Sequence, residues 1–257
     1  MFLELHRVTR RFGGLVAVSD LSMIVAERTI HGLIGPNGAG KSTVFNLISG
    51  VLPLSSGEIV FRGQRISGLR GSEISRRRIG RTFQATTLFR EYTPLENLMV
   101  AAHLRSVEGL LPTLLASAAY RRREREAVAH ARDLLISVGL AEAAGSSRPA
   151  GTLPHRDQKA LSIAMAMATG ADLLLLDEPL AGLAAQERER VLDLLRRLRD
   201  AGLTVLLVEH DMRAVMELCD VISVLDHGVR IAEGPPEAVQ QNPAVIEAYL
   251  GVEVGDA

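Results

Sequence analysis

The sequence has few of the residues that build cross-linked, metal-bound or strongly charged proteins. Its 257 residues include one cysteine, Cys219, and no tryptophan. A single cysteine excludes a disulfide scaffold, and no spacing of Cys and His residues indicates a metal site. The 29 basic residues face 30 acidic ones, which gives a formal net charge of −1. Because general binding to nucleic acid requires a basic excess, this balance argues against that class of protein.

Long apolar stretches and lysines are scarce as well. The longest apolar stretches, residues 110–120 and 162–169, are much shorter than the ~20 residues that span a bilayer. The first residues also lack the apolar core of a signal peptide. We therefore expect a cytoplasmic chain that reaches a membrane only through a partner. Among the basic residues only two are lysines, Lys41 and Lys159.

The apolar pattern alternates between strand-like and helix-like segments. Short apolar runs at 29–34, 58–61, 173–176 and 204–208 predict strands, and residues 186–199 predict an amphipathic helix. This alternation is typical of an α/β fold. Residues from about 85 to 155 show no clear strand pattern, so we expect a mostly helical lobe there, with helices at 98–104, 110–120 and 124–138.

A phosphate-binding motif follows the first of the buried strands. Residues 35–43 read GPNGAGKST, which matches the P-loop pattern. In this motif glycines turn backbone N–H groups toward a phosphate, the lysine reaches the β- and γ-phosphates, and the serine hydroxyl binds Mg²⁺. The predicted nucleotide-binding residues are Gly35, Pro36, Asn37, Gly38, Ala39, Gly40, Lys41, Ser42 and Thr43.

Two carboxylates end the leucine run at 173–176. Asp177 is placed to hold Mg²⁺ through water, and Glu178 to orient and deprotonate the attacking water. The alternative interpretation is a solvated Asp-Glu pair that starts a turn before Pro179. The P-loop upstream favours the catalytic interpretation.

Taken together, these motifs resemble those of ABC-transporter ATP-binding subunits, and more narrowly the Liv-type subunits of branched-chain amino acid importers. The similarity runs along the whole chain, in VTRRFGGLVAVSDLS (8–22), the P-loop, RTFQ (81–84), LFREYTPLENLMVAAH (88–103), LVEHDM (207–212) and NPAVIEAYLG (242–251). It implies a P-loop NTPase core (residues 1–84 and 156–257) with an antiparallel β subdomain, and an inserted α-helical subdomain at roughly 85–155. All of these belong to one ATP-binding domain.

The resemblance also assigns roles to single residues. It implies that Phe12 stacks on adenine, that Gln84 contacts Mg²⁺ and the attacking water, and that His210 contacts the γ-phosphate. Each has a simpler alternative. Phe12 could be a core aromatic, and His210 an ordinary histidine at a strand end. Gln84 by itself carries no signal, and its role depends on the matched residues around it.

The sequence departs from the family in the signature motif, which presents backbone N–H groups to the γ-phosphate held by the partner subunit. The corresponding residues are Leu153, Pro154, His155, Arg156 and Asp157. Arg156 replaces the key glycine, whose close approach and positive φ a long side chain opposes. Ala184 replaces the Asn or Asp usual at the end of the D-loop. We therefore expect an intact P-loop half-site and a damaged signature half-site.

The resemblance predicts an ATP-hydrolysing, Mg²⁺-dependent subunit of an importer, at the cytoplasmic face of the inner membrane. Its expected partners are a second ATPase subunit, in a hetero- or homodimer, two permease subunits and, indirectly, a solute-binding protein. The solute stays open, because similar subunits serve urea, short amides or other amino acids. Two alternatives remain: a regulatory subunit that binds ATP with little hydrolysis, and a soluble ABC ATPase acting on DNA or ribosomes.

Overall fold

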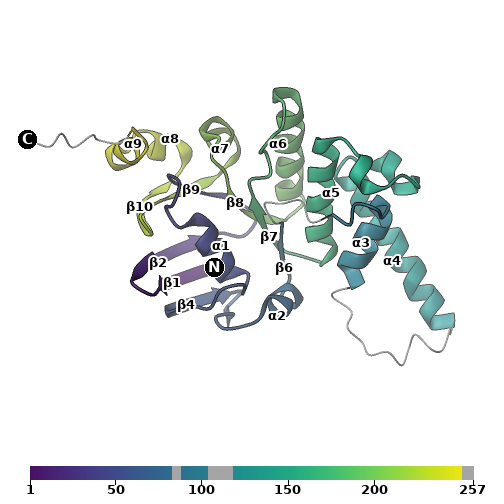
Figure 1. Ribbon diagram of the computed structural model, residues 1–257, viewed down its shortest axis with the longest axis horizontal. Coiled ribbons are helices and arrows are strands. Elements are labelled where there is room, and N and C mark those ends of the chain that lie inside the picture. Colours follow the sequence, from purple (N-terminus) through teal and green to yellow (C-terminus); the bar gives the residue numbers. More distant parts are fainter. Residues whose placement is uncertain (83–87, 104–117, 251–257) are drawn as a thin grey trace, which may run out of the picture.

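The computed structural model describes residues 1–82, 88–103 and 118–250, and two sheets organise it (Figure 1). The larger sheet has the strand order β10-β9-β3-β8-β7-β6. Its strands are β3 (Ile30–Ile34), β6 (Ile79–Arg81), β7 (Leu173–Asp177), β8 (Thr204–Val208), β9 (Val221–Asp226) and β10 (Val229–Gly234). All neighbours pair in parallel except β10, which joins β9 antiparallel. The α/β prediction is confirmed.

The central strands are buried on both faces, which explains their continuous apolar sequences. Every residue of β3, β7 and β8 is buried. Because successive side chains point to opposite faces, the leucine run divides between two cores. Leu174 and Leu176 pack with α5 (His155–Ala168), α6 (Ala185–Asp200) and α7 (Met212–Leu218), and Leu173 and Leu175 pack with α1 (Lys41–Ile48). The strands predicted at 29–34, 173–176 and 204–208 are thus confirmed.

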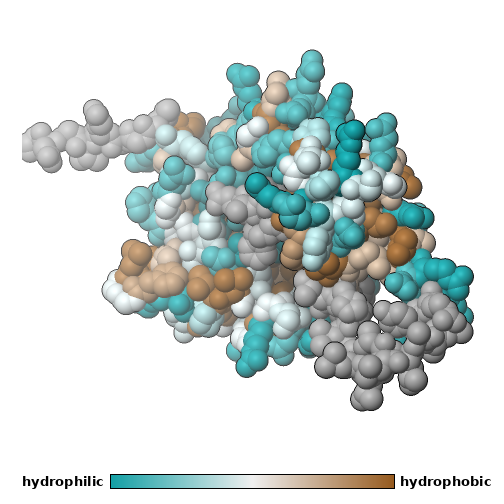
Figure 2. All heavy atoms as spheres, turned by 45° about the vertical axis from the view of Figure 1, so that its right-hand side comes forward, coloured by the Kyte–Doolittle hydropathy of each residue, from teal (hydrophilic) through white to brown (hydrophobic). Residues whose placement is uncertain are grey.

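The second sheet closes the core that contains α1. It is antiparallel, in the order β2-β1-β4-β5, with β1 (Leu3–Phe12), β2 (Leu15–Val25), β4 (Ser56–Phe61) and β5 (Gln64–Arg65). The apolar sequence pattern singled out only the part of β4 at 58–61, while the family resemblance implied an antiparallel β subdomain, which is present. Figure 2 shows apolar side chains gathered over this sheet, at the lower left.

Helices fill the chain between β6 and β7 in the residues that the structure describes there. They are α3 (Pro94–His103), α4 (Ala118–Ser137), two short 3₁₀ helices (Ala141–Gly145 and Ala150–Thr152) and α5. The predicted helices at 98–104 and 124–138 correspond to α3 and α4, whereas most of the one predicted at 110–120 lies outside the described residues. Since α5 contacts α3 and α4 as well as β6 and β7, it bridges the helical lobe and the sheet. The domain boundary near residue 155 stays a prediction.

The remaining helices are α2 (Gly71–Arg76), α8 (Pro236–Gln240) and α9 (Pro243–Leu250). α8 packs on β9 and β10, and α9 packs on β10 and α8. Within the described ranges, no helix has both the length and the apolar character needed to cross a membrane. Cys219 is buried, and its sulfur would lie 2.9 Å from a Cβ placed on Gly32 of β3, so the cysteine fills a space that glycine leaves open.

Candidate functional site

The P-loop is a tight backbone curl between β3 and α1. Gly35 has φ +146° and Gly40 has φ +102°, conformations that favour glycine. A Cβ on Gly35 would lie 2.0 Å from the carbonyl oxygen of Leu225, and one on Gly40 would lie 2.5 Å from that of Ala17. Other side chains would therefore force the loop apart. The geometry is that of a cradle whose N–H groups and following helix N-terminus suit a phosphate.

Lys41, the first residue of α1, extends along the inside of this loop. Its Nζ donates hydrogen bonds to the carbonyl oxygens of Gly35 (2.6 Å) and Pro36 (2.8 Å). Burial lowers the pKa of Lys41, while the charges of Glu178 and Asp177 act in the opposite direction. The P-loop lysine and the two carboxylates predicted from the sequence therefore share one site.

Asp177 ends β7 and is almost entirely buried beside Arg81 of β6. The Arg81 Nη2 atom lies 3.5 Å from the Asp177 Oδ2 atom, and the Asp177 N–H donates to Thr82 Oγ1 at 3.2 Å. Burial raises the pKa of Asp177, and the Arg81 charge acts against this rise. Arg81 also donates to Asn46 Oδ1 of α1 (2.8 Å) and to the Oγ of Ser49, which directly follows α1 (2.6 Å). It thus links α1, β6 and β7 behind the phosphate site.

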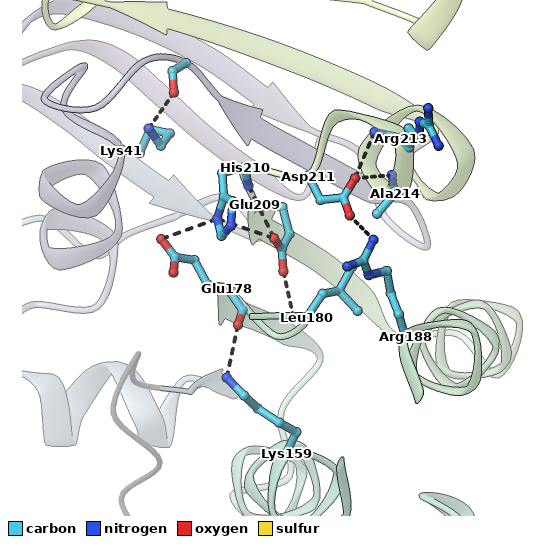
Figure 3. A network of polar contacts seen from close by, with 11 residues as sticks. Lys41, Lys159, Glu178, Leu180, Arg188, Glu209, His210, Asp211, Arg213 and Ala214 are labelled. Carbon is cyan, nitrogen blue, oxygen red and sulfur yellow. Dashed lines mark hydrogen bonds and ion pairs between the residues drawn. The ribbon is translucent and has the colours of Figure 1, made fainter. Parts of the chain in front are cut away.

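Glu178 follows Asp177 with an unusual backbone conformation. Its φ is +49°, in a left-handed region that costs a non-glycine residue about 1 kcal/mol or more. Its N–H donates to the carbonyl of Val208 (2.9 Å), and its Oε1 lies 3.9 Å from His210 Nδ1 (Figure 3). Strained backbone at a predicted catalytic carboxylate is typical of functional sites.

Glu209 lies beneath His210, and no sequence pattern assigned it a role. It is 1% exposed, and its carboxylate accepts hydrogen bonds from the N–H groups of Leu180 (2.7 Å) and His210 (3.3 Å) (Figure 3). Burial raises its pKa, and these hydrogen bonds act against the rise. Glu209 therefore joins the ends of β7 and β8 and fixes the backbone from which His210 extends. The only sign of this role in the sequence was a charged residue directly after the apolar strand β8.

Phe12 lies at the end of β1 and is 41% exposed, so it is not a core aromatic. The Arg10 guanidinium lies 4.4 Å from its ring centroid. Phe12 pairs across the hairpin with Leu15, two residues before Ala17, whose carbonyl abuts Gly40 of the P-loop. The hairpin therefore brings an exposed aromatic ring toward the nucleotide site.

The signature residues form a second group at the start of α5. Pro154 precedes the helix, which His155 begins. Arg156 turns onto its neighbour, with Nε 2.8 Å from Asp157 Oδ1, and lines a cavity of about 320 Å³ between α5 and α6 together with Arg190 and Arg197. The His155 ring lies 3.1 Å from a Cβ placed on Gly182. Leu153 contributes its carbonyl to Gln158 Nε2 at 2.8 Å.

Ala184 and Gln84 are the two remaining predicted positions. Ala184 immediately precedes α6, and its N–H donates to Glu187 Oε2 at 3.0 Å. The Glu187 side chain therefore caps the start of the helix, although alanine has no polar side chain of its own. Gln84 lies outside the described residues. Its predicted contact with Mg²⁺ and water stays a prediction.

Comparison with known proteins agrees with this geometry. A family model described as ABC transporter matches residues 18–181, and one described as branched-chain amino acid ATP-binding cassette transporter matches residues 229–255. The chain is 45% identical to the high-affinity branched-chain amino acid transport ATP-binding protein BraF of Pseudomonas aeruginosa, and 43% identical to its counterpart LivG of Escherichia coli. Each alignment covers 97% of both chains.

A solved structure shows the same architecture. The nucleotide-free ATP-binding cassette of an ABC transporter superposes with a TM-score of 0.85 at 30% identity, over 97% of this chain and 99% of the other. The P-loop, the carboxylates that end β7 and the histidine after β8 occur here in one fold and in one site. The chain therefore belongs to the ABC transporter family, as an ATP-binding subunit with ATPase function.

Proposed function

We propose that the chain powers the import of branched-chain amino acids. The observation that carries this proposal is the match of residues 229–255 to the branched-chain amino acid cassette model, in a chain that also resembles BraF and LivG along nearly its full length. The described part of this segment forms β10, α8 and α9, which pack beside the ATPase core.

The proposed partners follow from that role. Two ATPase subunits, identical or different, close around nucleotides between P-loops and signature motifs, and two permease subunits form the path through the membrane. A solute-binding protein acts on the permeases rather than on this chain. The chain then works at the cytoplasmic face of the inner membrane, held there by the permeases. In this proposal the permeases bind the helical lobe, which extends from about residue 85 to about residue 155.

The site residues divide the ATPase chemistry among themselves. We assign phosphate binding to the P-loop and Lys41, and adenine contact to Phe12. Mg²⁺, which supplies charge neutralisation on the phosphates when bound, fits the Ser42 hydroxyl and the buried carboxylate of Asp177. The family resemblance adds Gln84, which lies outside the described residues. The phosphate-binding assignment is supported by the tight curl of the P-loop, which a Cβ on Gly35 would obstruct.

For hydrolysis, we assign the general base to Glu178 and the γ-phosphate contact to His210. The two side chains lie together at the carboxyl ends of β7 and β8. A base held by its backbone next to an imidazole can orient water and take its proton as the bond to phosphorus forms. The pairing of Glu178 with His210 supports the hydrolytic role over the purely regulatory one.

The signature half-site, Leu153 to Asp157, is offered to a partner's nucleotide. In this chain Arg156 bonds the Asp157 carboxylate. This contact supports the view that the signature surface differs from the usual one and that its carboxylate charge is neutralised within the chain. We infer that a homodimer has two weakened composite sites, whereas a heterodimer with an intact signature in its second subunit retains one efficient site.

Uptake of radiolabelled leucine by cells that lack the chain tests the import role. Uptake should return with the wild-type chain and should stay absent with Lys41→Ala, while uptake of an unrelated solute such as glutamate is unaffected. Leucine uptake that does not depend on the chain would contradict the substrate assignment. Parallel assays with urea and a short amide would then identify the solute class.

A further inference from the structure

Lys159, the second of the two lysines, reaches from α5 to the backbone of Glu178. Its Nζ lies 3.1 Å from the Glu178 carbonyl oxygen (Figure 3). Lys159 lies two residues after Asp157, the last signature residue, and one helical turn beyond His155, which begins α5. A single side chain therefore connects the helix that carries the signature motif with the proposed catalytic base.

The contact falls where the backbone of Glu178 most needs support. The residue holds a left-handed conformation, with φ +49°. Its N–H is bonded to the Val208 carbonyl, and its own carbonyl accepts from the Ala181 N–H at 3.2 Å as well as from Lys159. Since strained φ/ψ values persist only when surrounding contacts over-determine them, removal of one contact should alter the direction of the carboxylate.

The electrostatic surroundings explain why a cation serves here. Lys159 is half-buried, and the carboxylates of Glu209, Glu178 and Asp177 all stabilise its charge. Its own burial nevertheless lowers its pKa. A positive charge among three carboxylates reduces their mutual repulsion while it aims its hydrogen bond at a carbonyl oxygen. An apolar side chain of similar length, such as methionine, would do neither.

We propose that Lys159 is a positioning residue that couples the first turns of α5 to the orientation of Glu178. The proposal rests on the proposed role of Glu178 as general base. A shift of α5 relative to β7 changes the Lys159–Glu178 contact directly, because the lysine is attached to one element and its acceptor to the other. Engagement of the signature motif with a partner subunit is thereby communicated to this chain's own hydrolytic centre.

Steady-state ATP hydrolysis by the full chain tests the functional part. Lys159→Met should lower kcat by about 10- to 100-fold, with KM for ATP changed less than about twofold, and Lys159→Arg should restore most of the rate. Thr169→Val is the matched control, because it removes a side-chain hydrogen bond to a backbone carbonyl at the far end of the same helix. An unchanged kcat in Lys159→Met would overturn the proposal, and so would a rise in KM as large as the fall in kcat.

A spectroscopic measurement tests the contact without turnover. Glu178-Pro179 is the only Glu-Pro dipeptide in the sequence, so labelling glutamate with ¹³C at the carbonyl and proline with ¹⁵N isolates the Glu178 carbonyl in a carbon-detected CO–N spectrum. Its carbon resonance should move in Lys159→Met and remain near the wild-type position in Lys159→Arg and Thr169→Val. A resonance that does not move in Lys159→Met would refute the contact.

A further variant separates this proposal from the assignment on which it rests. Glu178→Gln should lower kcat by roughly 10²- to 10⁴-fold with nucleotide binding intact. If it hydrolyses ATP at the wild-type rate, the general-base assignment fails. If its kcat falls in this way while Lys159→Met is fully active, the base assignment stands and only the positioning role is lost.

Discussion

The Nδ1 atom of His210 and the Oε1 atom of Glu178 lie 3.9 Å apart, although 31 residues separate them in the sequence. They meet because β7 and β8 are parallel neighbours, paired from Leu173 with Thr204 to Asp177 with Val208. His210 is 65% exposed and Glu178 26%. The imidazole is thus the more exposed of the two groups, and the carboxylate is the more buried.

This proximity predicts that His210 and Glu178 act as a unit. His210→Ala and Glu178→Gln should each lower kcat by roughly 10²- to 10⁴-fold, and the double variant should lose little more than the worse single one, because residues of one catalytic unit are strongly non-additive. ATPase rates of the three variants, with nucleotide affinity measured by titration calorimetry, check this. If the fold-loss of kcat in the double variant equals the product of the two single losses, the two residues have independent roles.

Removal of Arg81 should destabilise the fold. Arg81→Met leaves the buried Asp177 carboxylate without its closest cation and also breaks the bonds to Asn46 and Ser49. Loss of one partner of a buried ion pair typically lowers the free energy of unfolding by about 3–5 kcal/mol. Urea denaturation measures the change, with the exposed Arg122 of the Arg122–Glu126 pair mutated to Met as control and expected to lose under about 1 kcal/mol.

If the Arg81 loss arises from the charge left on Asp177, then Asp177→Asn should recover part of it in the Arg81→Met background. Equal stability of the single and double variants would instead assign the loss to packing and to the hydrogen bonds with α1. A change below about 1 kcal/mol in Arg81→Met would contradict the ion pair's structural role altogether.

The buried His31 should make stability depend on pH. His31 is 1% exposed, its Nε2 lies 2.9 Å from Ser223 Oγ, and burial lowers its pKa to about 4, with Glu233 opposing and Arg230 reinforcing the shift. The unfolded chain binds the proton near pH 6.5, so this stability is complete above pH 6.5 and is lost as pH falls toward 4. Its share of the loss between pH 7 and 5 is about 2 kcal/mol.

Denaturation curves at pH 7 and pH 5 measure this dependence. His31→Gln should be less stable at pH 7 but should show a smaller difference between the two pH values, since its side chain does not titrate. An unchanged pH difference in His31→Gln would assign the dependence to other groups.

Restoration of the signature glycine should raise hydrolysis by the isolated chain. Arg156→Gly removes the side chain that bonds Asp157 and permits the close backbone approach that phosphate binding uses. An oxyanion-stabilising backbone donor contributes on the order of 10²-fold to kcat, so an increase of about 10-fold or more is expected. Arg190→Gly, on the same cavity in α6, is the control. Robust hydrolysis by the wild-type chain alone would contradict the damaged half-site.

The sequence predicted the parts of this fold whose residues are local and periodic. The runs at 173–176 and 204–208 are apolar because β7 and β8 are covered on both faces, and the P-loop glycines reflect steric contacts with the carbonyls of Leu225 and Ala17. The strand β1 escaped the apolar pattern because its exposed positions carry charges and register shifts interrupt it. The strand β2 escaped it because Ser19, Asp20 and Ser22 interrupt its apolar residues. Only the family resemblance predicted their sheet.

The motif residues of the site could be predicted from the sequence, but the residues that hold them in position could not. Lys41, Asp177, Glu178 and His210 each stand in a recognisable local pattern. Arg81, Glu209 and Lys159 support those residues from other elements, and the distances involved depend on how β6, β8 and α5 pack. A one-dimensional pattern contains no information on such contacts, so a lysine 19 residues before Glu178 gave no sign of its acceptor.

The placement of the two lysines has a practical consequence for chemical labelling. Lys41 and Lys159 both donate to backbone carbonyls at the nucleotide site, and burial lowers the pKa of both amines. Because the chain has no other lysine, an acylating reagent can modify lysine side chains at these two positions alone. Protection of each lysine by ATP, followed by peptide mass spectrometry, would then report occupancy and closure without any engineered label.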